Sequence, residues 1–267
     1  MSWRIAATSA IGTAHTKNGQ PCQDSVRVRL VQTPNGPILI SAVSDGAGSA
    51  AHSEIGSRAA VTTATYLIEN FLEAGGSVRA IGRDGVLSWL AQIQTAISSF
   101  ASESGASTRE FACTLLVAVI APEEAVFFQV GDGAMVVREE GDDGWAYIFW
   151  PQHGEYINST NFITASNAAD VMEFAAVSRC IESFSAFSDG IESLVLHYAT
   201  KSVHDPFFNN MIAPVRAALH EGLDDGLSAS LLNYLNSERV CARTDDDKSL
   251  VLATRYEPTL PSADAAS

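Results

Sequence analysis

One stretch constrains this chain more than any other. Residues 38–44 form an apolar, β-prone run that stops directly at Asp45 and Gly46. Such a run predicts a buried strand, and the Asp-Gly pair predicts a turn at its exposed end. The following residues, 53–71, have the composition of a helix packed on the sheet. Asp-Gly is also a common hairpin pair, so Asp45 alone has an ordinary structural explanation.

The same arrangement of an acid beside an apolar run recurs along the chain. Asp189 follows residues 181–188, Asp132 follows residues 125–130, and Asp246 stands just before residues 250–253. If these strand ends converge, their carboxylates form a cluster of hard oxygen ligands. Such a cluster suits Mg²⁺ or Mn²⁺.

Composition limits the class of protein. The chain has 267 residues, 46% of them hydrophobic, and a formal net charge of -15. One domain over residues 1–256 with a flexible tail at 257–267 fits this length. The negative charge argues against nucleic-acid and membrane partners. With four scattered cysteines and no secretory signal, we expect a cytoplasmic monomer.

The pattern of elements predicts an α+β fold. Short strands joined by tight turns fill residues 3–44 and 111–150, with a polar loop at 12–21 and an irregular segment at 151–169. Helices are expected at residues 54–73, 86–100, 207–220 and 227–236. Two antiparallel sheets flanked by helices would give a four-layer α/β/β/α sandwich.

Five short motifs that contain acidic residues occur along residues 1–256. They are Gln23-Asp24, Ser44-Asp45-Gly46-Ala47-Gly48, Gly131-Asp132-Gly133, Ser188-Asp189-Gly190 and Asp246-Asp247-Lys248-Ser249. In this order the sequence resembles the metal-dependent protein phosphatases of the PP2C (PPM) type. The Gln-Asp pair and the loop at 154–160 are similar to a bacterial subgroup.

The resemblance implies a centre with two Mn²⁺ or Mg²⁺ ions, with room for a third. In it, Asp45 bridges both ions beside the carbonyl of Gly46, and Asp189 and Asp246 complete the ligands of the first ion. The resemblance further implies that Asp24 orients metal-bound waters and that Gln23 stands in the shell of the second ion. Asp132 would hold a weaker additional ion.

The sequence departs from the family pattern near the expected substrate. Gln23 replaces a glutamate, Ala47 stands where many eukaryotic members have an acid histidine, and the phosphate-binding arginine is missing. His15 and Lys17 are the nearby candidates for substrate binding, although a histidine in a polar loop is more often solvated or a turn cap. Glu192 could substitute for a missing ligand of the third ion.

The implied activity is hydrolysis of phosphoserine and phosphothreonine in proteins, by in-line attack of a water bridging the two ions. The substituted positions leave open a catalytically weak module that binds a phosphoprotein or partner. A hydrolase of small phosphoesters would keep the same centre and differ in substrate.

Overall fold

The computed structural model describes residues 2–152 and 160–256. Its framework is two packed β-sheets. The first has six strands in the order β12-β1-β13-β9-β6-β7, which span Gly222–Leu223, Ser2–Ala10, Lys248–Tyr256, Ile181–Phe187, Ala134–Glu139 and Ala146–Tyr147. The second has the order β2-β3-β4-β5-β8, which span Ser25–Val31, Ile38–Ser44, Leu115–Ile120, Ala125–Val130 and Glu173–Val177.

Nearly all strand neighbours in the two sheets run antiparallel, as expected for strands joined by short turns. The pair β1 and β12 is parallel, with Arg4 beside Gly222. A small separate hairpin is formed by β10 (Leu196–His197) and β11 (Ser202–Val203).

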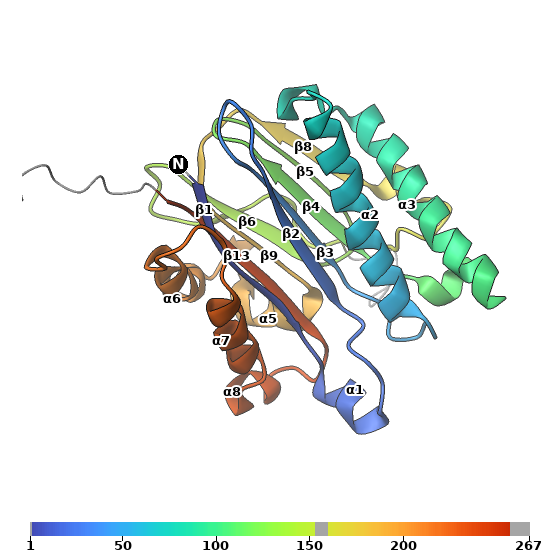
Figure 1. Cartoon of the computed structure of the whole chain (residues 1–267). Helices are drawn as coiled ribbons and strands as arrows, with labels where there is room; N and C mark the ends of the chain where they lie inside the picture. Colours follow the sequence, from blue (N-terminus) through green and yellow to red (C-terminus); the bar gives the residue numbers. More distant parts are fainter. Residues whose placement is uncertain (1, 153–159, 257–267) are drawn as a thin grey trace, which may run out of the picture.

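Helices cover the outer faces of both sheets (Figure 1). The long helices α2 (Ser53–Glu73) and α3 (Arg83–Ser104) pack on the five-stranded sheet. On the six-stranded sheet the cover is α6 (Asp205–Arg216) and α7 (Asp225–Leu235). The predicted four-layer sandwich is confirmed.

Short helices fill several connections. The α-helical ones are α1 (Thr13–Asn18), α4 (Ala168–Val171), α5 (Glu192–Val195) and α8 (Glu238–Cys241). The 3₁₀ helices are η1 (Val78–Ala80), η2 (Thr108–Phe111) and η3 (Asp189–Ile191). Two expectations were wrong: the loop at 12–21 contains α1, and β8 was not foreseen.

The core lies in three layers, as the alternation of each strand requires. Between the sheets, large side chains such as Trp3, Leu39, Phe127, Phe184 and Val251 are fully or almost fully buried. Separate clusters seal each sheet against its helices. The sandwich is therefore rigid at its centre, and the strand ends are held in fixed positions.

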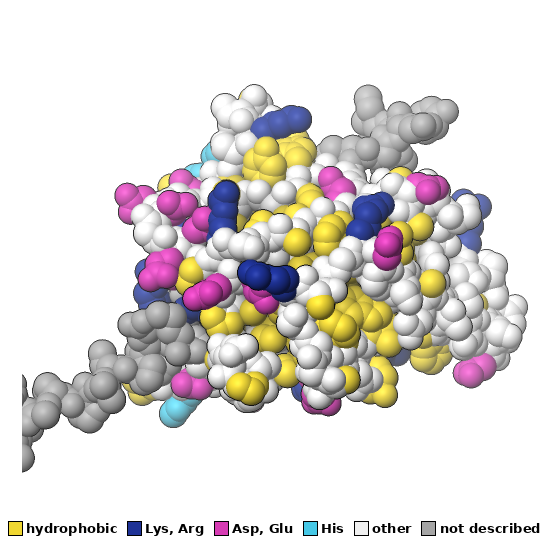
Figure 2. Space-filling model, turned by 90° about the horizontal axis from the view of Figure 1, so that it is seen from above, with side chains coloured by type: hydrophobic (Ala, Val, Ile, Leu, Met, Phe, Trp, Pro, Cys, Tyr) yellow, Lys and Arg dark blue, Asp and Glu magenta, His cyan; other side chains and the backbone are white. Residues whose placement is uncertain are grey.

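On the face drawn in Figure 2, basic and acidic side chains are interspersed, so neither sign of charge is concentrated there. No helix in the described part of the chain has the length and apolar character needed to cross a bilayer. The expected tail at 257–267 and most of the loop at 154–160 lie outside the described residues. The assignment of residues 1–256 to one domain stays a prediction.

Candidate metal centre

The acidic residues gather at one end of the sandwich, where strands of both sheets stop. Asp45 directly follows β3, and Asp189 lies just beyond β9. Asp246 and Asp247 directly precede β13, which pairs antiparallel with β9 through Leu250 and Phe187. Because antiparallel neighbours end and begin at the same edge, these carboxylates meet across the gap between the two sheets.

Asp45 and Asp189 lie close enough for each to shift the pKa of the other. Burial raises the pKa of Asp45 well above its usual range, and the charges of Asp24, Asp189 and Asp246 raise it further. The Asp189 carboxyl also raises the pKa of Asp45, whereas the Asp45 carboxyl lowers that of Asp189. Burial raises the pKa of Asp189 to about 6. Without a cation, burial and mutual repulsion therefore oppose the ionisation of both groups.

Asp24 is buried close to this pair. It is 5% exposed, and its Oδ2 accepts a hydrogen bond of 2.7 Å from the hydroxyl of Ser188. Burial raises the pKa of Asp24 to about 7, an effect that the Ser188 bond partly offsets and the charge of Asp247 adds to. Its second oxygen, Oδ1, is buried and accepts no hydrogen bond.

Asp247 joins three segments that carry the centre. Its carboxylate accepts hydrogen bonds from the backbone N–H groups of Gly12, at 2.6 Å, and of Gln23, and it lies 2.9 Å from Nδ1 of His15. It is 2% exposed. Asp247 therefore holds the first loop in place, so that Asp24 stays beside Ser188.

The turn at Asp45 is held by Thr114, at the start of β4. The Asp45 N–H donates to the hydroxyl of Thr114 at 2.9 Å, and the Thr114 N–H donates to the Asp45 carbonyl at 2.8 Å. Gly46 is required here, because a Cβ atom would come within 2.7 Å of the Gln23 carbonyl oxygen. No sequence pattern pointed to Thr114.

Asp132 closes another side of the centre. It lies in the turn between β5 and β6, is 8% exposed, and its Oδ2 accepts a hydrogen bond from the hydroxyl of Thr160. Its charge also raises the pKa of Asp189. Glu192 follows on α5, where burial raises its pKa to about 7 and a hydrogen bond from Tyr198 lowers it.

The remaining site residues of the sequence analysis fall into two groups. Gln23 is buried beside Asp24. Asp246 is exposed, and its Oδ1 accepts a hydrogen bond from the N–H of Asp247. His15 is buried on α1 against Asp247, whereas Lys17 on the same helix is exposed. A substrate-binding role for His15 and Lys17 stays a prediction.

The donor set fits divalent metal ions. One buried oxygen each of Asp24, Asp189 and Gln23 has no hydrogen-bond partner among the described residues. Crowded carboxylates with such oxygens are the ligands that hard cations prefer. Within residues 2–152 and 160–256, no three Asp, Glu, His or Cys side chains are already arranged around one ion position.

Comparison with known proteins identifies the family. The sequence profile of the family described as Protein phosphatase 2C matches residues 11–235. The chain belongs to the protein phosphatase 2C family. It is also 34% identical over 256 residues to Serine/threonine-protein phosphatase 3 of Escherichia coli (strain K12), covering 95% of this chain and 98% of that protein.

Solved structures share the PP2C fold. The serine/threonine phosphatase PstP/Ppp of Mycobacterium tuberculosis has a TM-score of 0.63 at 16% identity, with 96% of this chain and 100% of that chain covered. PppA of Pseudomonas aeruginosa gives 0.63 at 16% identity, with 96% and 99% covered. The chain is thus a PP2C-type, metal-dependent serine/threonine phosphatase, as its motifs predicted.

Proposed function

We propose that the cluster at the end of the sandwich binds two Mn²⁺ or Mg²⁺ ions, and that it is the active site. Asp45 and the carbonyl of Gly46 would lie between the ions, with Asp189 and Asp246 on the first and Gln23 near the second. Asp132 would contribute to a third, weaker site. The observation that carries the proposal is the crowding of buried carboxyl groups at these strand ends. Asp24 and Asp189 each keep a buried oxygen without a hydrogen-bond partner among the described residues, and burial raises the pKa of Asp24, Asp45 and Asp189, which a divalent cation would offset.

Two bound ions supply Lewis acidity, which lowers the pKa of a water and balances charge on the phosphoryl oxygens. The residues of this chain do the rest. Asp24, fixed by Ser188, would orient the attacking water by accepting a hydrogen bond from it. Attack is in line and direct, so that no phosphorylated enzyme forms.

The proposed substrates are proteins carrying phosphoserine or phosphothreonine. Lys17, exposed on α1 at the rim, is proposed to contact the phosphate together with His15, whose ring is also held by Asp247. Four cysteines without disulfide bonds suit a reducing compartment, and we propose a cytoplasmic location. We further propose a monomer that binds neither nucleic acid nor membrane.

The test is hydrolysis of p-nitrophenyl phosphate with Mn²⁺ by the intact protein and by Asp45→Asn and Asp246→Asn. Both variants should lose about a hundredfold or more of the turnover, because each removes an ionised ligand. Asp143→Asn, on an exposed loop, is the matched control and should keep full activity. Full turnover in both ligand variants, or in excess chelator, refutes the proposal.

A second candidate, a catalytically weak module that binds phosphoproteins, is favoured by Gln23 and Ala47, which replace a charged ligand and an acid. Calorimetric titration with Mn²⁺ separates the two. Binding with turnover identifies an enzyme, whereas absence of Mn²⁺ binding together with undetectable turnover on phosphopeptides identifies the module.

A further inference from the structure

A groove of about 730 Å³ opens beside the proposed metal centre. Small apolar side chains form its floor, namely Ala47, Ala50 and Ala112, and the partly buried ring of Phe162 packs against them. Ala47 directly follows Gly46, and its N–H donates to the Ala112 carbonyl at 2.9 Å. The floor of the groove therefore begins one residue from the proposed metal ligand.

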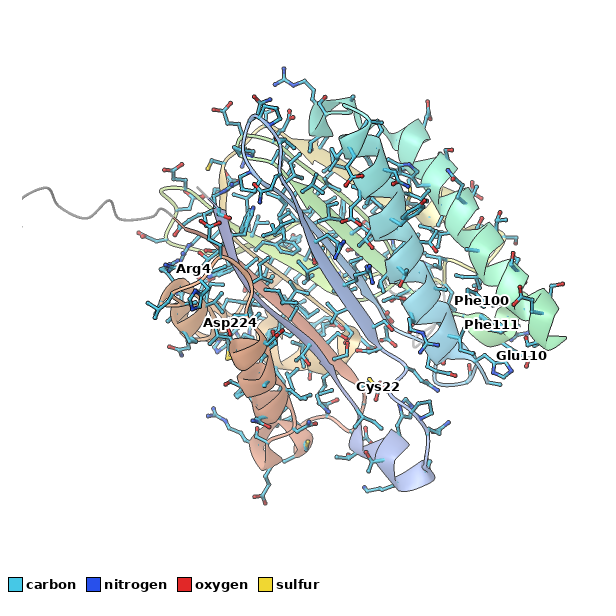
Figure 3. The ribbon with its side chains drawn as sticks, in the orientation of Figure 1. Arg4, Cys22, Phe100, Glu110, Phe111 and Asp224 are labelled. Atoms are coloured by element: carbon cyan, nitrogen blue, oxygen red, sulfur yellow. The ribbon has the colours of Figure 1, made fainter. Side chains whose placement is uncertain are left out.

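The rim of the groove is polar and its frame is rigid. Hydroxyl groups of Ser49, Ser107, Thr164 and Ser166 line it. The 3₁₀ helix η2 forms one wall, and a capping box between Ser107 and Glu110 fixes its start. The carbonyl of Glu110 also accepts the N–H of His52 at 2.8 Å. Figure 3 shows Glu110 and Phe111 of this wall near the end of α2.

Arg109 on η2 is the positive charge at this rim. Its side chain is exposed, and among the described residues it makes no hydrogen bond and no ion pair. The adjacent Glu110 forms no ion pair with Arg109 among the described residues, and its carboxylate accepts hydrogen bonds from the N–H and hydroxyl of Ser107. By contrast, Arg29 and Arg79 are paired with glutamates.

We propose that this groove binds the polypeptide segment next to the phosphorylated residue, and that Arg109 pairs with an acidic side chain of that segment. This inference rests on the proposed active site. Continuity with Gly46 places the groove where a flanking segment must run, and the alanine floor leaves room for its backbone and small side chains. The chain carries a net charge of -15, so an acidic segment needs a local cation.

The experiment uses phosphoserine peptides with alanine flanks, in which a single aspartate is moved through the flanking positions. For the intact enzyme with Mn²⁺, aspartate at the position facing Arg109 should raise kcat/KM by about fivefold, as expected for an exposed ion pair. Arg109→Ala should remove this preference. Arg109→Glu should transfer the preference to lysine at the same position.

Two controls keep the readout specific. Turnover of p-nitrophenyl phosphate, which has no flanking segment, should be unchanged in Arg109→Ala. Arg79→Ala removes a positive charge that is paired with Glu124, in the turn between β4 and β5 at the opposite end of the sheet. This variant should therefore keep the aspartate preference. A flat scan with the intact enzyme, or a preference that survives in Arg109→Ala, overturns the inference.

Failure of the active-site proposal gives a different result. If the intact protein turns over neither p-nitrophenyl phosphate nor peptides, fluorescence anisotropy with the same labelled phosphopeptides still reports the groove. An aspartate preference in binding that Arg109→Ala removes supports the inference, and equal affinities refute it. A dimer in sedimentation that Arg109→Glu dissociates would assign the groove to a second copy and also refute it.

Discussion

The carboxylate of Asp247 accepts a hydrogen bond from the backbone N–H of Gly12 at 2.6 Å, across 235 residues of sequence. The same carboxylate accepts the N–H of Gln23 and lies 2.9 Å from Nδ1 of His15. One buried side chain thus ties the loop after β1, the entry to β2 and the start of β13 into one unit. The position of Asp24 depends on it.

Replacing Asp247 by alanine should therefore destabilise the protein and weaken metal binding. Two buried backbone N–H groups lose their acceptor, and each costs about 1–3 kcal/mol when left unsatisfied. Thermal unfolding and Mn²⁺ titration of Asp247→Ala measure both effects. Asp245→Ala, two residues away and exposed, is the control and should match the parent protein. Equal melting temperatures for the two variants would contradict the role given to Asp247.

Thr114 should control the catalytic rate through the backbone of Asp45. Thr114→Val removes the hydroxyl that accepts the Asp45 N–H, and we expect a loss of about 1–3 kcal/mol, partly as stability and partly as reduced kcat. Thr114→Ser keeps the hydroxyl and should retain most of the rate. Steady-state kinetics with Mn²⁺ compares the two, and equal losses in both would show that packing of the methyl group matters instead.

Gly190 should not tolerate a side chain. A Cβ atom there would come 1.8 Å from the Asp247 carbonyl oxygen, so Gly190→Ala must displace the backbone before β13. We expect destabilisation of about 2–4 kcal/mol in chemical denaturation. Gly85 lies in the first turn of α3, where an added Cβ atom would meet no neighbouring atom. Gly85→Ala is therefore the control, and its free energy of unfolding should increase by about 0.5–1 kcal/mol. A neutral Gly190→Ala would mean that this contact is not present.

The metal-free protein should lose stability as pH rises from the acidic range. The pKa values of Asp24 and Asp189 are raised to about 7 and about 6, so the folded state binds more protons than the unfolded state above about pH 4. The free energy of unfolding then falls with increasing pH until both groups have ionised. Melting temperatures in chelator at about pH 5 and about pH 7.5 test this sign.

Mn²⁺ should reverse that trend, because the ion replaces the protons that the carboxylates otherwise keep. The increase in melting temperature on adding Mn²⁺ should be larger at the higher pH. Asp45→Asn, which removes one of the crowded charges, should flatten the pH dependence in chelator. A melting temperature that rises steadily with pH in the metal-free parent protein would contradict the proposed crowding of carboxylates.

Much of this organisation was readable in the sequence because it is local. Apolar runs ending at Asp45, at Asp132 and shortly before Asp189 predicted strands with acids at their ends, and the structure places these residues there. The helix around residues 54–73 was also predicted closely, since twenty residues give a clear period. The six residues of α1 are too few for such a signal, and they were taken for a loop.

The sequence by itself therefore determined the strands, the long helices and the acids at the strand ends, because each depends on neighbouring residues. Only the tertiary structure decided that Asp247 would hold Gly12 and that Thr114 would hold Asp45. It also decided that Arg109 would line the same groove as Ala47 without an ion pair in the described part of the chain. Those contacts arise where antiparallel strands and the turns between them meet. Strand register and the packing of η2 set them, and no local pattern encodes either.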